Sequence, residues 1–263
     1  MKAELTEEKR LRMTNRSHNQ IYIITAQDSP NTMKEIGRLR EIAFRAAGGG
    51  TGKSMDIDEY DIMDNPYKQL IVWNPEAEEI LGGYRYILGT DVRFDEHGAP
   101  ILATAHMFNF SDKFLKDYLP TTIELGRSFV TLEYQSTRAD SKGLFALDNL
   151  WDGLGALTVV MPNVKYFFGK VTMYPSYHRQ SRDKILYFLL KHFADKDTRF
   201  LHISETVIDG CTEHTHGRAE THIGIHQRGN IIPRLTDFTI QNLIVFLKRV
   251  FISFGNILRI RTT

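Results

Sequence analysis

The chain has 263 residues, of which 42% are hydrophobic and 25% are charged, and its formal net charge is +1. This length allows a sizeable core in one large or two small domains, while the near-zero charge excludes a general attraction to nucleic acid. The single cysteine, Cys211, excludes an intrachain disulfide. Residues 1–17 lack the apolar core of a secretory signal, and no run of 18 apolar residues predicts a membrane span, so we expect a cytoplasmic protein.

The predicted elements alternate between strands and helices after a polar, poorly ordered lead-in at residues 1–19. The first elements in chain order are a strand at 20–26, a helix that Asn31 caps and that ends near Ala47, and an acidic loop at 54–65. A hairpin of strands 68–73 and 80–88, a short helix at 111–118 and a strand at 122–132 follow. The last elements are an apolar helix at 144–160, a strand at 164–173 and an amphipathic helix at 182–193. This order predicts an α/β fold, with a mixed central sheet flanked by helices, over residues 20–197. Residues 198–263 are rich in histidine and then basic and apolar, and we expect them to form a separate, divergent segment.

The strand at 122–132 carries the residues with the clearest chemical meaning. Glu124 and Arg127 interrupt an apolar run, and Gly126 between them predicts a bulge or a close backbone approach. Because side chains alternate along a strand, Glu124 and Ser128 are expected on one face and Arg127 on the other. A partly buried carboxylate beside unpaired backbone N–H groups would suit acyl transfer, since it can accept a proton from the attacking amine while the N–H groups stabilise the oxyanion. The alternative is a structural Glu–Arg pair at a sheet edge.

Three blocks of the sequence resemble the acyl-carrier-protein-dependent branch of the GNAT superfamily. This branch includes the acyl-homoserine-lactone synthases, the ornithine-lipid N-acyltransferases and the N-acyl amino acid synthases. The blocks are Leu39-Arg40 with Phe44 and then Asp56-Ile57-Asp58-Glu59-Tyr60-Asp61, next Gly82-Gly83-Tyr84-Arg85-Tyr86, and last Glu124-x-x-Arg127 followed by Ser128-Phe129-Val130. The resemblance spans about residues 36–196 and implies a GNAT fold, in which the pantetheine arm of a thioester lies between splayed strands at 122–132 and 164–173.

The resemblance also implies a role for each matching residue. Glu124 would be the catalytic base and Arg127 the organiser of the site. The other predicted members are Arg40, Asp58, Asp61 and Arg85 around the acceptor pocket, Ser128, Phe129 and Val130 beside the acyl donor, and Tyr177 as the acid that protonates the leaving thiolate. For Tyr177, packing at a strand end is the alternative.

The loop after this strand bears on the identity of the donor. GNAT proteins that use acetyl-CoA carry Arg/Gln-x-x-Gly-x-Gly/Ala there to bind pyrophosphate, and residues 135–143 do not match that pattern. This favours an acyl carrier protein over acyl-CoA, because a carrier protein presents phosphopantetheine without pyrophosphate. Arg138 and Lys142 either bind that phosphate or an acidic carrier helix, or are solvated loop charges.

The predicted function is therefore transfer of a fatty acyl group from an acyl carrier protein or acyl-CoA to the amine of an amino acid such as ornithine or glycine. The thioester is a co-substrate, and no permanently bound cofactor is expected. Two alternatives remain: an acetyl-CoA-dependent N-acetyltransferase of a small amine, and a non-catalytic domain that binds lipid or a partner protein.

Three further segments predict no additional chemistry. Residues 48–54 resemble a P-loop, but Ala47 stands where the motif requires glycine, and a helix rather than a strand precedes the segment. The histidines between 202 and 226, with Cys211, lack a recognised zinc spacing, so no metal is predicted. The apolar, basic stretch at 243–260 is either a peripheral membrane contact or a buried helix.

Overall fold

The structure is a computed structural model, and it describes residues 1–135 and 145–171 together with 178, 180–181, 183–185, 187–188, 201–203 and 243–244. These residues fall into two compact units. The first unit comprises the described parts of Met1–Ala103 and Lys116–Gly169, and the second comprises Thr104–Leu115 with the described residues from Lys170 to Val245. The predicted division at residue 197 remains a prediction.

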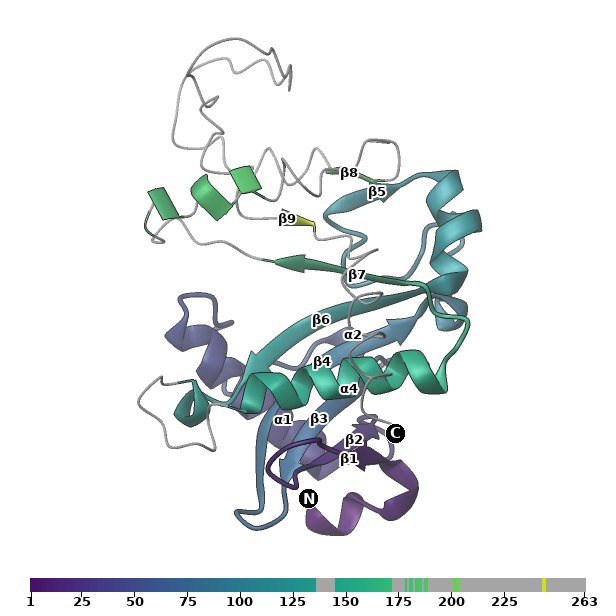
Figure 1. Cartoon of the computed structure of the whole chain (residues 1–263). Helices are drawn as coiled ribbons and strands as arrows, with labels where there is room; N and C mark the ends of the chain where they lie inside the picture. The colour runs from purple at the N-terminus through teal and green to yellow at the C-terminus, as the bar shows by residue number, and fades with distance from the viewer. Residues whose placement is uncertain are drawn as a thin grey trace, which may run out of the picture. The chain divides into compact units, whose positions relative to one another are not determined.

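A mixed sheet forms the centre of the first unit (Figure 1). In spatial order its strands are β1 (Arg10–Met13), β2 (Gln20–Ile24), β3 (Lys68–Asn74), β4 (Glu79–Leu88), β6 (Thr122–Val130) and β7 (Tyr166–Val171). Neighbouring strands are antiparallel except β6 and β7, which are parallel. The pairing of β6 with β7 ends at Leu125 and Gly169, although β6 continues to Val130. The first half of β6 is thus paired on both sides, whereas among the described residues its second half pairs only with β4.

Two long helices cover opposite faces of this sheet, α1 (Pro30–Ala46) and α4 (Ala146–Val160). Alternate residues of β3 separate the two cores, because Ile71 packs with α1 whereas Leu70 and Val72 pack with α4. The shorter elements of the chain are α2 (Glu59–Ile62), the 3-10 turns η1 (Lys2–Glu4), η2 (Glu7–Lys9), η3 (Gly89–Asp91), η5 (Leu119–Thr121) and η6 (Leu132–Tyr134), and the π-helical turn η4 (Phe114–Tyr118). The predicted fold class, a mixed sheet flanked by helices, is confirmed.

The N-terminal segment differs from its prediction as a poorly ordered lead-in. Residues 10–13 form β1, and Leu5 is buried in the core beneath α1. The Glu4 carboxylate accepts hydrogen bonds from the backbone N–H groups of Asn31 at 3.1 Å and Thr32 at 2.8 Å, in the first turn of α1. The predicted cap at Asn31 is therefore wrong. Ser29 is the N-cap residue but makes no side-chain cap bond, and Glu4 satisfies these N–H groups instead.

The described part of the second unit contains two short strand pairings. β5 (Phe108–Phe110) pairs antiparallel with β8 (Leu201–Ile203), and the last two residues of β7 pair antiparallel with β9 (Leu243–Ile244). The described residues between 180 and 188 are helical, as predicted there. Within the described portions of both units, no helix combines the length and the apolar character that crossing a membrane would demand.

Candidate active site

A β-bulge in β6 shapes the candidate site. Two residues of β6, Arg127 and Ser128, stand opposite a single residue of β4, Tyr84. Arg127 adopts a positive φ of 46°, a region that few residues other than glycine occupy. The bulge predicted from Gly126 is confirmed, and it begins one residue after the glycine.

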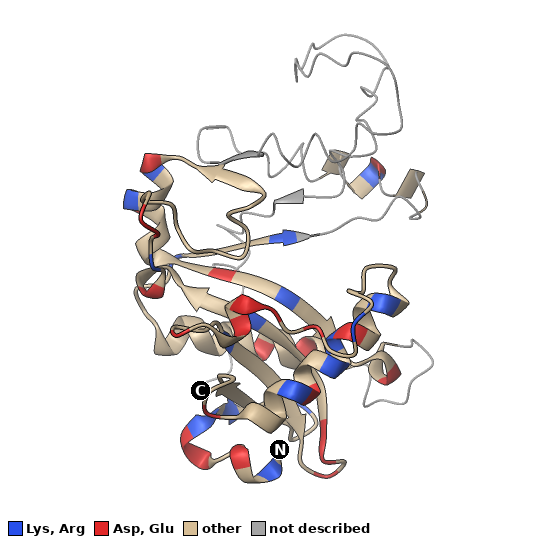
Figure 2. Cartoon of the chain, turned by 180° about the vertical axis from the view of Figure 1, so that it is seen from behind, with Lys and Arg blue, Asp and Glu red and all other residues tan. Residues whose placement is uncertain are grey.

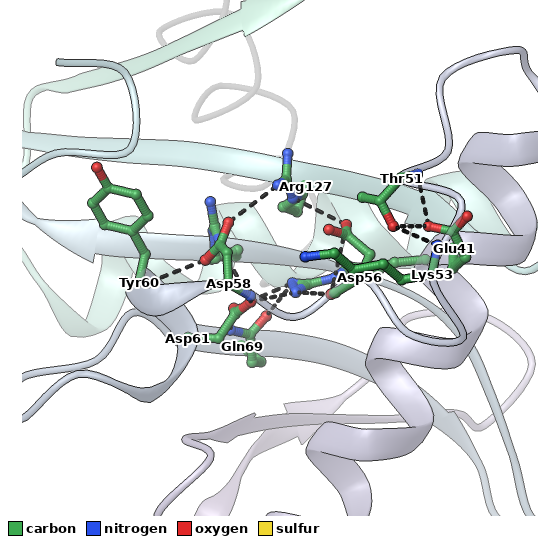
Figure 3. Close-up of polar contacts among 11 residues, drawn as sticks. Glu41, Thr51, Lys53, Asp56, Asp58, Tyr60, Asp61, Gln69 and Arg127 are labelled. Atoms are coloured by element: carbon green, nitrogen blue, oxygen red, sulfur yellow. Dashed lines mark hydrogen bonds and ion pairs between the residues drawn. The ribbon is translucent and has the colours of Figure 1, made fainter. Parts of the chain in front are cut away.

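The prediction that Glu124 and Arg127 lie on opposite faces of the sheet is wrong. Ile123 packs with α4, so Glu124 points to the opposite face, which α1 covers. Arg127 also reaches that face, where it contacts Asp58 (Figure 3). The extra residue of the bulge shifts the alternation by one position and brings both side chains to one side.

Three arginines and three aspartates form a continuous network on this face. Its buried centre joins α1 to α2: Arg40 donates to Asp61 at 2.7 Å and to the backbone carbonyl of Asp56 at 2.8 Å. Both the Arg40 and the Asp61 side chains are 0% exposed. A buried charge is costly unless it is paired, so this pair has a structural role and holds α1 and α2 together beneath the site.

The outer part of the network lies over β4 and β6. Arg85 donates to Asp58 at 2.6 Å and lies 3.3 Å from Asp61. Arg127 donates to Asp58 at 3.1 Å through Nη2, and its Nε lies 3.0 Å from Asp56. Arg127 is 32% exposed and Asp58 is 24% exposed, so these two border the solvent. Figure 2, which views this face, shows the acidic segment after α1 crossing beside the basic residues of the sheet.

The spacing of the aspartates follows from a short helix. Asp58 caps α2 by accepting a hydrogen bond from the Tyr60 N–H at 3.1 Å, and Asp61 accepts one from the Asp58 N–H at 3.1 Å. This reciprocal arrangement is a capping box. It holds the two carboxylates one turn apart, with Asp61 inward and Asp58 outward.

The charges of the network act on its carboxylates in different ways. Burial raises the pKa of Asp56 above its ordinary value, although Arg127 and Arg40 oppose that rise. Burial acts in the same direction on Asp58, but there Arg85 and Arg127 outweigh it and hold the pKa below the ordinary value. Asp58 is therefore the carboxylate that stays ionised at the solvent border.

Glu124 joins this network through Tyr67. The Tyr67 hydroxyl donates a hydrogen bond to Glu124 and accepts one from the Ala103 N–H at 2.8 Å. Burial, together with the negative charge of Glu124, raises the pKa of Tyr67, so the hydroxyl remains a donor. The Arg85 guanidinium lies 5.1 Å from the centre of the Tyr67 ring. Glu124 itself is buried, at 2% exposure.

Sequence reasoning did not identify Tyr67. It immediately precedes β3, and a tyrosine beside a strand is ordinarily a packing residue. Asp56 lay within the matching block but was not assigned to the site. Its importance rests on its backbone carbonyl and on its ion pair with Arg127, which a residue pattern does not reveal.

The remaining predicted residues lie in different surroundings. Ser128 is exposed, Phe129 is buried in the core beneath α1, and Val130 packs against the core beneath α4. The side chains of Phe129 and Val130 therefore serve the core, which leaves only their backbone for contact with a donor. The predicted donor contacts Arg138 and Lys142, and the predicted acid Tyr177, lie outside the described residues.

The glycine-rich segment that resembles a P-loop binds a carboxylate of the chain itself. Glu41 accepts hydrogen bonds from the N–H groups of Thr51 and Gly52, each at 2.9 Å, and from the Thr51 hydroxyl at 2.7 Å. These bonds, of which that from the Thr51 hydroxyl acts most strongly, lower the pKa of Glu41 to about 2. Two backbone donors of the loop are thus occupied by the protein's own anion, and Figure 3 shows the contacts of Thr51 with Glu41.

Part of the chain matches a known protein family, and a longer part aligns with two named proteins. Residues 39–143 match the family described as acetyltransferase (GNAT) domain. The chain is 84% identical over 197 residues to a glycine N(alpha)-acyltransferase of Phocaeicola vulgatus, and 85% identical over 197 residues to one of Bacteroides thetaiotaomicron. These alignments cover 75% of this chain but only 60% and 58% of the two relatives.

Among the solved structures that the chain matches is that of the AHL synthase LasI. It is 14% identical with a TM-score of 0.38, over 65% of this chain and 78% of that one. The family match covers the network, the bulge and Glu124 together. Residues 39–143 thus match the GNAT domain model, in line with the resemblance of the three sequence blocks, and the chain is similar over 197 residues to proteins named glycine N(alpha)-acyltransferase.

Proposed function

We propose that this protein transfers a fatty acyl group from a phosphopantetheine thioester to the amine of an amino acid, with glycine as the first acceptor to test. The names of the two relatives support this choice of acceptor. The observation that carries the proposal is the position of Glu124. This buried carboxylate stands one residue before the last β6–β7 pair, on the same face as the arginine–aspartate network.

In the proposed reaction Glu124 is the general base. The acceptor ammonium gives up one proton, to Glu124 directly or through water, and the resulting amine attacks the thioester carbonyl carbon. The carbon–nitrogen bond forms and the carbon–sulfur bond breaks, after which the leaving thiolate takes the second proton released by the nitrogen. Tyr67 holds Glu124 in place, and N–H groups of β6 beyond Leu125 are the proposed oxyanion donors.

The finer assignments are parts of the same proposal. The mismatch of residues 135–143 to a pyrophosphate-binding loop favours an acyl carrier protein as donor. Tyr177 remains the predicted proton donor to the thiolate, and Arg138 and Lys142 remain predicted donor contacts. The membrane-surface contact of residues 243–260 also remains a prediction.

The test is a matrix of donors and acceptors with the purified full chain. Long-chain acyl carrier protein, the matching acyl-CoA and acetyl-CoA are each incubated with glycine, ornithine and methylamine, and products are identified by mass spectrometry. We expect a long-chain N-acylglycine, formed fastest from the carrier protein. Acetylation alone would favour the acetyltransferase alternative, and the absence of an acylated product in every combination would reject the proposal.

The matched variant is Glu124→Gln, which keeps the size of the side chain and removes the base. We expect kcat to fall by about 10²–10⁴-fold, the usual contribution of a general base. Undiminished turnover in this variant would remove Glu124 from that role.

A further inference from the structure

The face of β6 above Gly126 is open, although charged groups surround it. Gly126 pairs with Arg85, and paired residues of neighbouring strands project to the same face, so a Cβ on Gly126 would point into the polar network. Apart from the chain neighbours Leu125 and Arg127, no described residue has an atom within 4 Å of that Cβ position. Glu124 precedes this opening by two residues, and Arg127 follows it directly. The missing side chain of Gly126 therefore leaves space between the proposed base and an arginine.

Arg127, the residue after Gly126, has a hydrogen-bond donor that no described residue is shown to occupy. Its Nε and Nη2 atoms contact Asp56 and Asp58, while Nη1 has no partner among the described residues. The other two arginines of the network are not accessible, since the side chains of Arg40 and Arg85 are 0% and 3% exposed. Arg127, at 32% exposure, is thus the arginine of the network that can meet a ligand from solution.

The charges around the opening suit a zwitterion. The three arginines and three aspartates of the network balance formally, and Glu124 adds one negative charge at one end. The free Nη1 of Arg127 offers a positive donor at the other end. A molecule with an ammonium and a carboxylate joined by one carbon would place opposite charges next to both groups.

We propose that the acceptor amino acid binds over Gly126, with its carboxylate on Nη1 of Arg127 and its ammonium toward Glu124. Arg127 is then a specificity-determining residue, and the enzyme selects acceptors by their free carboxylate. This inference rests on the proposed acyl transfer to an amino acid and names the site and the chemical group that the transfer requires.

The first experiment fills the opening with one methyl group. The methyl group of Gly126→Ala meets no described residue other than its chain neighbours within 4 Å, and Gly126 does not have a positive φ, so the fold should tolerate the change. We expect kcat/KM for glycine to fall by at least about tenfold, which corresponds to about 1.4 kcal/mol of lost transition-state binding. The urea midpoint should stay unchanged.

Gly155→Ala is the matched control. Outside its chain neighbours and the adjacent backbone of α4, Gly155 likewise meets no described atom within 4 Å of an added Cβ, but it lies in α4 on the opposite face of the sheet. It should keep full activity and gain slightly in stability, because alanine is the better helix former. Equal activity of the two variants would overturn the proposed location of the acceptor.

The second experiment removes the carboxylate from the acceptor. Wild-type enzyme should prefer glycine to glycinamide by about 10²-fold, since a site built for a charged partner rejects an analogue that lacks it. Arg127→Gln should lower kcat/KM for glycine and bring this preference close to one. A purely structural role of Arg127 would instead lower both activities by the same factor.

A binding measurement makes the result independent of turnover. Calorimetry of the full chain with N-dodecanoylglycine and with its carboxamide should show tighter binding of the acid to the wild type, and no such difference in Arg127→Gln. Equal affinity of the wild type for both compounds, or equal acylation of glycine and glycinamide, would overturn the inference and leave acyl transfer intact. Failure to acylate either acceptor would instead reject the proposed function.

Discussion

At the scale of single residues, Tyr67 is the clearest positioning group of the site. Tyr67→Phe removes the donor to Glu124 and leaves the Ala103 N–H without its acceptor. We expect kcat to fall by about tenfold while KM for the acyl donor stays constant, because the change affects the orientation of the base rather than binding. An unsatisfied buried N–H should also cost about 1–3 kcal/mol of unfolding free energy.

Tyr60 provides the matched control for this change. Its ring also lies beside Arg85, 5.7 Å from the guanidinium, so both tyrosines share the aromatic contact. Its hydroxyl has no hydrogen-bond partner among the described residues, so Tyr60→Phe should leave kcat unchanged. A similar loss of kcat in both variants would show that the rings, and not the Tyr67 hydroxyl, support the site.

At the scale of elements, the start of α1 depends on a residue far away in the sequence. Glu4 accepts hydrogen bonds from the backbone N–H groups and the side chains of Asn31 and Thr32, at 2.7 to 3.1 Å. Burial alone would raise the pKa of Glu4, but these bonds outweigh it and lower the pKa to about 2. A carboxylate at a helix N-terminus also interacts favourably with the helix dipole.

Glu4→Gln should therefore destabilise the protein in a pH-dependent way. The pKa is lower in the folded state than the ordinary value of 4.5, so the ionised carboxylate stabilises the fold above pH 4.5. We expect the variant to lose about 1 kcal/mol at neutral pH, and this difference from the wild type to shrink as the pH falls from 4.5 toward 2. Urea denaturation across this range measures it, with the exposed Glu8→Gln as control. A difference that grows on acidification would contradict the assignment.

The elements that sequence patterns predicted are those with local signals. The β2, β3, β4, β6 and β7 strands and both long helices follow from runs of β-branched residues and from helical spacing of apolar residues. The N-terminal segment did not, because Leu5 and Glu4 are held by contacts with distant residues rather than by a periodic pattern. Gly126 predicted the bulge, but it did not predict the face of the sheet to which Arg127 points. The extra residue that reverses the direction of Arg127 becomes visible only in the register with β4.

At the scale of the whole molecule, one network joins most of the first unit. Side chains from α1, the segment after it, α2, β3, β4 and β6 meet there, and Gln69 of β3 donates to Asp61 at 2.9 Å. The pocket residues and the site organiser that the resemblance implied thus differ in their burial. Arg40 and Asp61 are fully buried and hold the elements together, whereas Asp58 and Arg127 face the solvent. A matching motif cannot separate these groups, because burial depends on the packing of six distant segments.

This division predicts that stability and activity separate between two aspartates. Asp61→Asn leaves the buried Arg40 with one negatively charged partner among the described residues, the Asp56 carboxylate at 3.6 Å, and breaking a buried pair in this way costs about 3–5 kcal/mol. That is a large part of a typical net stability of about 5–15 kcal/mol, so the whole unit should unfold at a much lower urea concentration.

Asp58→Asn should cost less, about 1–2 kcal/mol, because Asp58 is partly exposed and Arg85 keeps Asp61 at 3.3 Å. Its larger effect should be on kcat/KM for glycine, since Asp58 fixes the direction of Arg127. Urea denaturation and acceptor kinetics on both variants measure the two effects, and a stability loss below about 1 kcal/mol in Asp61→Asn would show that Arg40 does not depend on its partner.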